Sequence, residues 1–445
     1  IKAVPEGTVL PVRNCCMTVE NTDPKCYWLV NFLETILVQT WYPMTVATNS
    51  REQKRVILKY LHETGDPSLV DFKLHDFGFR GVSSVETAGV GGSAHLTQFS
   101  GTDTVAAMVV ARDYYGKTDN VAGFSIPASE HSTITAWGKD SEEEAFANML
   151  EKYPKGMVAC VSDSYNIFDA CSELWGEKLR DRVLERDGTL VVRPDSGDPK
   201  TIDLKVLELL GEKFGTITND KGYKELPPQV RVIQGDGIHY ETVIEILKYL
   251  KDFGWSANNI AFGSGGGLLQ KLNRDALKCA FKAALAVVDG KEREVFKDPI
   301  TAPGKKSKRG YMTVNRDERG KISTRTGEDR DEKTDILQVV FEDGKLVKEY
   351  DWETVRENAK ITLEMVLGKS GKGSPSMSVR KASENFHKSV PVDENDGDAE
   401  SSKQSDVCDS KVKSCSTQED EDLDMKSSSE KDTKDESKAQ VECSS

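Results

Sequence analysis

The chain has 445 residues, a net charge of −14 and a hydrophobic fraction of 37%. It is long enough to bury a substantial core, and its acidic balance argues against nucleic acid as the main partner. The nine cysteines form no CxxC pair, so the sequence indicates neither a disulfide framework nor a zinc site and favours a reducing compartment, the cytoplasm. The most apolar early stretch, residues 27–46, contains Asn31, Glu34 and Pro43, which excludes a membrane span.

Both ends of the chain carry an expectation. It begins at Ile1 rather than Met, within a strand-like segment and without a signal-peptide pattern, so we expect a fragment with an unpaired strand edge and exposed apolar surface. Residues 369–445 are dominated by Ser, Lys, Asp and Glu, with no aromatic residue after Phe386. Such a composition predicts a disordered acidic tail behind a folded body, residues 1–368. Removing the tail after about Gly371 should leave the thermal midpoint nearly unchanged.

Short apolar runs, each ending in acidic or glycine residues, alternate with amphipathic stretches. After residues 73–81 and 123–132, the pattern becomes regular: the runs are 157–165, 189–197, 230–237 and 260–267, and the helix-like stretches are 166–185, 203–214, 240–253 and 268–285. This spacing predicts βα units with a parallel sheet. The polar residues after each run predict a site at the carboxyl edge of the strands, in a closed barrel or an open sheet alike. Residues 336–350 predict a hairpin turning at Asp343 and Gly344.

Three of the polar clusters suit a phosphorylated sugar. Residues 263–267 (GSGGG) precede a predicted helix, where glycines let the backbone approach an anion; the alternative is a turn that eases strand–helix packing. Arg193 and Asp195 in RPDSG suit a phosphate and paired ribose hydroxyls, or form an ion pair at a capped turn. Asp236 in QGDG suits ribose or makes an Asx-turn.

Two earlier motifs carry further candidates. His131 stands beside Glu130 in EHSTITAWGKD, and such a His can be an acid, a base or a phosphate acceptor, although a lone His is more often structural. Arg80 follows the aromatic pair Phe77 and Phe79, which suits a flat heteroaromatic ligand and a diphosphate, or core packing. The basic run 305–309 is by default a solvated loop, with a nuclear import signal as the alternative.

Taken together and in this order, these motifs resemble the nicotinamide phosphoribosyltransferases, of the type II phosphoribosyltransferase family. The likeness runs from Ile1 to about Leu367, and its most specific parts are EHSTITAWGKD and FGSGGGLLQKL. It implies an α/β fold, an irregular βα-barrel with a second α/β domain, assembled as a homodimer with shared active sites. It also implies transfer of the 5-phosphoribosyl group from phosphoribosyl pyrophosphate to nicotinamide, with Mg²⁺ on the pyrophosphate and ATP as an activating co-substrate.

The resemblance assigns roles to individual residues. Arg80, His131 and Arg193 would bind the diphosphate. His131 would also be phosphorylated by ATP, with Glu130 and Asp163 supporting it. The residues expected around the nicotinamide and the mononucleotide are Phe77, Asp103, Arg193, Asp195, Gly235, Asp236, Gly265, Gly266 and Arg274.

The sequence departs from the family at both ends, and rival functions remain. The acidic tail after about Leu367 is an extension that is not associated with the family's core. The family's first hundred or so residues are absent, including a tyrosine that covers the nicotinamide ring from the partner subunit opposite Phe77. We therefore expect residues 1–445 alone to show little activity. The rival functions are a nicotinate-specific phosphoribosyltransferase and a non-catalytic binding or signalling protein on the same scaffold; the complete set of Arg, Asp and His candidates argues against the second. Asp103 should favour the amide by accepting its N–H and repelling nicotinate.

Overall fold

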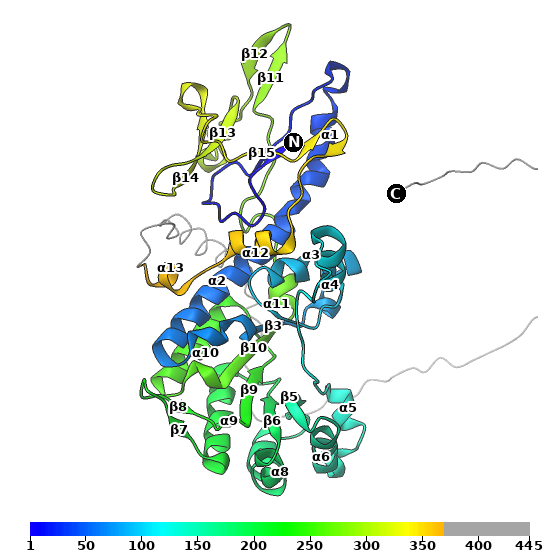
Figure 1. Cartoon of the computed structure of the whole chain (residues 1–445), viewed down its shortest axis with the longest axis vertical. Coiled ribbons are helices and arrows are strands. Elements are labelled where there is room, and N and C mark those ends of the chain that lie inside the picture. The colour runs from blue at the N-terminus through cyan, green and yellow to red at the C-terminus, as the bar shows by residue number, and fades with distance from the viewer. Residues whose placement is uncertain (369–445) are drawn as a thin grey trace, which may run out of the picture. The chain divides into compact units, whose positions relative to one another are not determined.

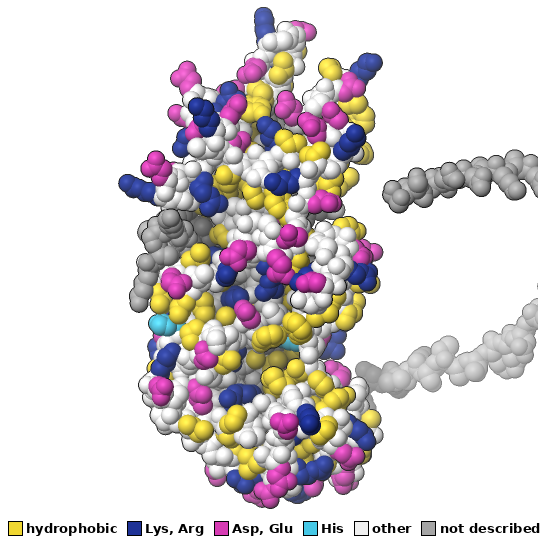
Figure 2. Space-filling model, viewed as in Figure 1, with side chains coloured by type: hydrophobic (Ala, Val, Ile, Leu, Met, Phe, Trp, Pro, Cys, Tyr) yellow, Lys and Arg dark blue, Asp and Glu magenta, His cyan; other side chains and the backbone are white. Residues whose placement is uncertain are grey.

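The computed structural model describes residues 1–368, and Figure 1 shows their helices and strands. The predicted acidic tail, residues 369–445, lies outside the described residues. Among the described helices, none is long and apolar enough to cross a membrane. On the face seen in Figure 2, basic and acidic side chains are interspersed rather than gathered into a field of one sign. That face therefore lacks the clustered basic surface that is typical of nucleic-acid-binding proteins.

A six-stranded sheet forms the centre of the fold. Its strand order is β4-β3-β10-β9-β6-β5, and every pairing in it is parallel. The strands are β3 (Leu74–Asp76), β4 (Gly101–Thr102), β5 (Lys155–Val161), β6 (Asp187–Arg193), β9 (Val230–Gln234) and β10 (Ile260–Ser264). The last four fall on the four apolar runs of the sequence, so the predicted parallel βα units are confirmed.

A short segment between the two edge strands, residues 124–128, closes the sheet into a barrel. Phe124 forms a parallel bridge with Gly101 of β4, and Ala128 forms one with Ala159 of β5. Backbone hydrogen bonds of 2.8–3.0 Å flank both bridges. The segment thus takes the place of a seventh strand without making a continuous ladder. The predicted irregular βα-barrel is confirmed.

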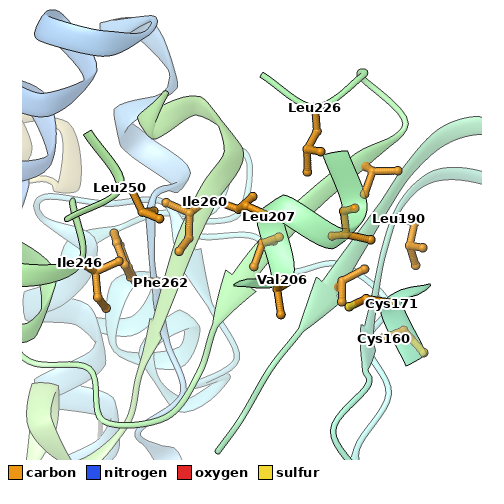
Figure 3. Close-up of a cluster of buried hydrophobic side chains, with 14 of the residues drawn as sticks. Cys160, Cys171, Leu190, Val206, Leu207, Leu226, Ile246, Leu250, Ile260 and Phe262 are labelled. Atoms are coloured by element: carbon orange, nitrogen blue, oxygen red, sulfur yellow. The ribbon is translucent and has the colours of Figure 1, made fainter. Parts of the chain in front are cut away.

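Amphipathic helices pack on the strands and supply the core. α9 (Pro199–Phe214) and α10 (Tyr240–Asp252) follow β6 and β9, in the places that helical spacing predicts. Leu207 of α9 and Leu250 of α10 share one hydrophobic cluster with Phe262 of β10, as Figure 3 shows. Burial of each such side chain contributes about 1.5–3 kcal/mol. The face of each helix that the sequence pattern marks as apolar is therefore the face that holds the barrel together.

The predicted helix over residues 166–185 is present in three pieces. They are α7 (Ile167–Asp169), a π-helical segment (Ala170–Lys178) and α8 (Arg180–Leu184). The π-helical segment buries Trp175, whose ring stacks on Phe146 with centroids 4.4 Å apart. The other helices are α1 (Leu29–Leu37), α2 (Trp41–Thr64), α3 (Val85–Leu96), α4 (Ala106–Tyr115), α5 (His131–Thr135), α6 (Glu142–Lys152), α12 (Trp352–Ala359) and α13 (Leu363–Leu367).

The predicted helix over residues 268–285 is wrong. α11 (Gly266–Leu269) is a single turn, and turns and extended chain follow it. Lys278 has a φ of 55°, a left-handed conformation that a right-handed helix does not contain. Of residues 270–284, only Ala276 is buried. Because most helical stability comes from packing of an apolar face, the spacing of apolar residues here finds no surface that would hold a helix.

A second set of strands lies outside the barrel sheet. β1 (Lys2–Ala3) is the central strand of an antiparallel sheet, between β15 (Gln338–Val339) and β2 (Met17–Thr18). Since both sides of β1 are paired, the unpaired edge expected at Ile1 is wrong. A small separate hydrophobic core consists of Val314, Ile322 and Leu337, and Val4, next to β1, packs against it. The remaining strands are β7 (Ile217–Thr218), β8 (Lys224–Glu225), β11 (Leu285–Val288), β12 (Lys291–Glu294), β13 (Met312–Arg316) and β14 (Ile322–Thr326).

The predicted hairpin near the end of the described residues is confirmed. β16 (Phe341–Glu342) pairs antiparallel with β17 (Lys345–Leu346). Between them, Asp343 and Gly344 have φ values of 47° and 83°. Positive φ at both central residues is the requirement of a type I′ turn, which Asp-Gly meets well.

Asp203 on α9 has a buried carboxyl group. It is fully buried, and neither of its carboxyl oxygens has a hydrogen-bond partner among the described residues. Burial, with a smaller contribution from Asp198, raises the pKa of Asp203 well above its ordinary value. An acid whose pKa is higher in the folded than in the unfolded state destabilises the fold progressively as pH rises above its unfolded pKa, near 3.9.

We therefore expect Asp203→Leu to raise the thermal midpoint most at pH 8 and least at pH 5. The gain should reflect removal of an unsatisfied buried polar group, which costs about 1–3 kcal/mol. Thermal unfolding of both proteins across this pH range is the measurement, with Asp203→Asn as a variant of matched shape that cannot ionise. If wild type and both variants lose stability in parallel as pH rises, Asp203 is not the source of the pH dependence.

Candidate active site

The carboxyl ends of the barrel strands carry most of the candidate residues. Asp103 follows β4, Asp163 follows β5, Arg193 ends β6, and Asp236 follows β9. Phe77 directly follows β3, and its backbone amide donates to a carbonyl at the end of β10. The loops at this edge of a parallel barrel converge on one mouth. The structure thus brings together groups that are far apart in the sequence.

His131 is oriented by Asp163. His131 is the first residue of α5, and its Nε2 lies 2.9 Å from Asp163 Oδ1. The second oxygen of Asp163 accepts hydrogen bonds from the backbone amide of Asp195, at 3.2 Å, and from the hydroxyl of Ser196, at 2.5 Å. Both oxygens of Asp163 are therefore engaged, which fixes the imidazole through Nε2. The other nitrogen, Nδ1, lies 3.9 Å from Asp195 Oδ2 and is left to meet a ligand.

Two guanidinium groups meet at Glu130. Arg193 lies 3.8 Å and Arg80 lies 3.6 Å from opposite oxygens of this carboxylate. The Arg193 side chain is 9% exposed and donates to Asp195 Oδ2 at 3.2 Å and to the carbonyl of Ser129 at 3.3 Å. Arg80 is 79% exposed and lines an open pocket. Arg193 is thus held in place, whereas Arg80 is exposed, and both contact Glu130 only at long distance. An incoming polyanion could therefore replace Glu130 as the partner of the two guanidinium groups.

Asp195 lies near two other carboxylates, those of Asp163 and Asp236. Burial raises its pKa, and the nearby charges of Asp163 and Asp236 raise it further, against the opposing effects of Arg193 and His131. Carboxylates that disfavour each other's ionisation suit a neighbouring cation or the hydroxyls of a sugar. No group of three or more His, Cys, Asp or Glu side chains in the described part of the chain is arranged to hold a metal ion. Carboxylates of this kind could also accept a magnesium ion that a bound diphosphate brings with it.

Gly235 leaves room for the carboxylate of Asp195. A Cβ atom on Gly235 would lie 2.5 Å from Asp195 Oδ1, closer than any real contact of this kind. Gly265 caps α11, with the Phe77 carbonyl 3.5 Å from its hypothetical Cβ, whereas a Cβ on Gly266 would meet nothing. The space at Gly266 is compatible with the predicted close approach of a ligand to the backbone.

A second group of candidate residues lies around β3. The rings of His75 and Phe77 are 5.1 Å apart. Both residues lie beside glycines in the adjacent strands: a Cβ on Gly101 would lie 2.7 Å from His75 Nδ1, and one on Gly263 would lie 1.9 Å from the Phe77 ring. The two glycines thus leave room for two flat rings side by side.

Asp103 belongs to this second group. His75 Nε2 lies 2.8 Å from Asp103 Oδ1, and the hydroxyl of Ser125 donates to the same oxygen. Burial opposes ionisation of Asp103, but the hydrogen bonds from His75 and Ser125 and the charge of Arg193 outweigh it and lower the pKa of Asp103. Asp103 is therefore an anion in a half-buried site. Neither His75 nor Ser125 was predicted as a site residue, although both stand in segments that the sequence pattern marks, residues 73–81 and 123–132.

Arg274 is the one candidate that the structure does not join to the others. Its guanidinium donates to the carbonyl of Cys279 at 2.6 Å and lies 3.8 Å from Asp275. These contacts are local to the turns that replace the predicted helix. Its assignment to the mononucleotide stays a prediction.

The sequence matches the model of the nicotinate phosphoribosyltransferase (NAPRTase) family over residues 72–345, a range that includes every candidate residue. The chain belongs to the nicotinate phosphoribosyltransferase family. The predicted relationship to phosphoribosyltransferases is thereby confirmed.

Two relatives of this family member are bacterial. The chain is 47% identical over 368 residues to the nicotinamide phosphoribosyltransferase of Xanthomonas campestris pv. campestris (strain 8004), covering 81% of this chain and 78% of the relative. It is 35% identical over 387 residues to the nicotinamide phosphoribosyltransferase of Acinetobacter baylyi, covering 82% and 76%. Among solved structures, nicotinate-nucleotide pyrophosphorylase from Pyrococcus furiosus matches 74% of this chain and 71% of its own, at 17% identity and a TM-score of 0.45.

Proposed function

We propose that the protein transfers the 5-phosphoribosyl group of phosphoribosyl pyrophosphate to nicotinamide, giving nicotinamide mononucleotide and pyrophosphate in NAD salvage. The observation that carries this proposal is the division of one barrel mouth into two parts. Arg193, Arg80 and His131 offer cationic and hydrogen-bonding groups for a diphosphate. Phe77 and Asp103 offer an aromatic face and an anionic acceptor, which suit a ring that bears an amide.

The reaction needs positioning and charge neutralisation more than covalent help from the protein. The bond between C1 of the ribose and the pyrophosphate oxygen breaks, and its electron pair leaves with the pyrophosphate. The pyridine nitrogen supplies the electron pair of the new bond to C1. Phe77 would hold the ring in line, while Asp195 and Asp236 would orient the ribose hydroxyls. Arg193 and Arg80 would stabilise the charge on the leaving group, and bound Mg²⁺ would supply further neutralisation.

We also propose that His131 accepts a phosphoryl group from ATP. Asp163 holds Nε2 at 2.9 Å, so Nδ1 would be the nucleophile and Asp163 would stabilise the charged ring. Glu130 caps α5 and contacts both guanidinium groups. Once phosphorylated, His131 would be anionic and would compete with Glu130 for Arg193. Transfer of the γ-phosphoryl group to Nδ1 breaks its bond to the bridging oxygen and releases ADP. Later attack of water on the phosphohistidine would release phosphate and restore His131, which would couple ATP hydrolysis to synthesis.

We place the enzyme in the cytoplasm as a homodimer with shared active sites. The described cysteines are all free thiols, as a reducing compartment maintains them. Around α1, the large apolar side chains of Tyr27, Trp28, Phe32 and Ile36 are more than half exposed. Exposed apolar surface of this kind is typical of a protein–protein contact. A second copy of the chain is the partner that the family resemblance predicts.

Nicotinate is the alternative acceptor, since the matching family model carries that name. Its carboxylate would meet Asp103, whose pKa is lowered and which is therefore anionic near pH 7. Two carboxylates in a half-buried site repel one another at a cost on the order of several kcal/mol. The charge of Asp103 thus favours nicotinamide.

The test is formation of nicotinamide mononucleotide from nicotinamide and phosphoribosyl pyrophosphate by the purified full-length protein, with nicotinate assayed in parallel. Absence of product from wild type would contradict the proposal. We expect Asp103→Ser and Asp103→Asn to narrow the preference for amide over acid at least tenfold, because the like-charge repulsion is removed. If both variants keep the wild-type ratio of kcat/KM values, Asp103 does not select the substrate.

For His131, we expect replacement by Ala to abolish both the acid-labile phosphate and the stimulation of synthesis by ATP, while leaving some ATP-independent turnover. The reason is that the proposed phosphoryl acceptor is removed, whereas Phe77 and Asp103 are untouched. Labelling with γ-phosphate-labelled ATP followed by acid treatment measures the first effect. Asp163→Asn, which weakens the hydrogen bond at Nε2, should lower labelling without eliminating it. Retention of label by His131→Ala would identify another acceptor.

A further inference from the structure

The acceptor Asp103 is held by two neighbours that lie on adjacent strands of the barrel. His75 is on β3, Asp103 follows β4, and Ser125 lies in the closing segment 124–128. β4 lies between the other two, with His75 paired to Gly101 in register and Phe124 bridged to the same glycine. The three side chains therefore meet as a direct result of strand order. Closing the barrel is what brings Ser125 to Asp103.

Both neighbours donate to the same carboxylate oxygen. An ionised carboxylate can only accept, so His75 Nε2 and the Ser125 hydroxyl each direct a hydrogen at Asp103 Oδ1. No hydrogen bond from the described residues reaches Oδ2. Two donors on one oxygen restrict rotation of the carboxylate and leave the second oxygen for a ligand. Asp103 is thus oriented so that Oδ2 is the oxygen that can accept a hydrogen bond from a ligand.

Neighbouring residues hold the imidazole ring of His75 in place. Its side chain is 14% exposed, against 45% for Asp103, so it lies deeper than the carboxylate it supports. Phe77 packs against one side of the imidazole, with ring centroids 5.1 Å apart, and Gly101 leaves room for Nδ1. His75 thus contacts both groups expected to meet a nicotinamide ring, the aromatic face and the amide acceptor. Its position suits a residue that acts through its neighbours.

We infer that His75, assisted by Ser125, is a positioning residue that aims Asp103 Oδ2 at the amide of the acceptor ring and so sets the choice between amide and acid. This inference rests on the proposed function. A carboxylate free to rotate would offer either oxygen and would lose alignment with the amide N–H. It would also turn away from an incoming nicotinate, which lessens the repulsion. Loss of the donors should therefore weaken nicotinamide use and relax its selection together.

Two substitutions separate hydrogen bonding from packing. His75→Phe keeps a ring against Phe77 but removes the donor, whereas His75→Gln removes the ring but offers an amide N–H at a similar reach. If His75 positions Asp103, Gln should outperform Phe; if His75 merely fills space, Phe should outperform Gln. Ser125→Ala and Ser125→Thr form a second pair, in which Thr retains the hydroxyl. Thermal melting establishes that each variant is folded.

In the full-length protein, we expect His75→Phe to raise the KM for nicotinamide about tenfold, the loss typical of one hydrogen bond to a charged group. kcat should change less, the KM for phosphoribosyl pyrophosphate should stay within twofold, and the amide-to-acid ratio of kcat/KM should fall. His75→Gln should recover most of both losses, and Ser125→Ala should show a smaller change of the same kind.

A His75→Phe protein that is folded and keeps the wild-type KM for nicotinamide and the wild-type amide-to-acid ratio would overturn the inference. So would a His75→Gln protein that is worse than His75→Phe in both quantities. Failure of the proposed function looks different, because wild type itself would then form no nicotinamide mononucleotide. If wild type is active and selective, the variants test His75 alone.

Discussion

Closure of the barrel by residues 124–128 is the constraint on which the rest of the site depends. The segment makes only isolated bridges, one to Gly101 and one to Ala159, yet it spans the gap between the two edge strands. The same stretch of chain supplies Ser125 at one end of the site and leads into Glu130 and His131 at the other. A regular strand would alternate its side chains strictly, whereas this segment can direct neighbouring groups to different parts of one mouth.

The two parts of the site use carboxylates in the same way. Asp163 receives donors on both oxygens and in turn orients His131. Asp103 receives donors on one oxygen, and no hydrogen bond from residues 1–368 reaches the other. Arg193 links the parts, since it contacts Asp195 directly and its charge also lowers the pKa of Asp103. Rigid acceptors around a shared cation allow a charged substrate to bind without much rearrangement of the protein.

The βα units and the turn at Asp343 could be predicted from the sequence because their signals are local. The long helix α2 could not, since its buried positions include polar side chains that bond to distant residues: Lys54 reaches Asp71 at 2.6 Å, and Ser50 lies 2.9 Å from His95. The helix predicted over residues 268–285 failed for the opposite reason, because its apolar spacing finds no packing surface. The missing prediction of α2 and the wrong helix prediction both arise from tertiary contacts, which a periodic pattern does not encode.

The same difference between local signals and tertiary contacts applies to the site residues. Residues at strand ends, such as Asp163 and Arg193, were predictable because a parallel barrel collects its strand ends at one edge. His75 lies within a strand, where an isolated histidine gives no signal until its neighbours are known. Its role can be inferred only from two neighbours: Gly101, which leaves room for the imidazole ring, and Asp103, which follows the strand of Gly101 and contacts His75. Small residues that make room are thus as informative about the ring end of this site as the charged residues are about its phosphate end.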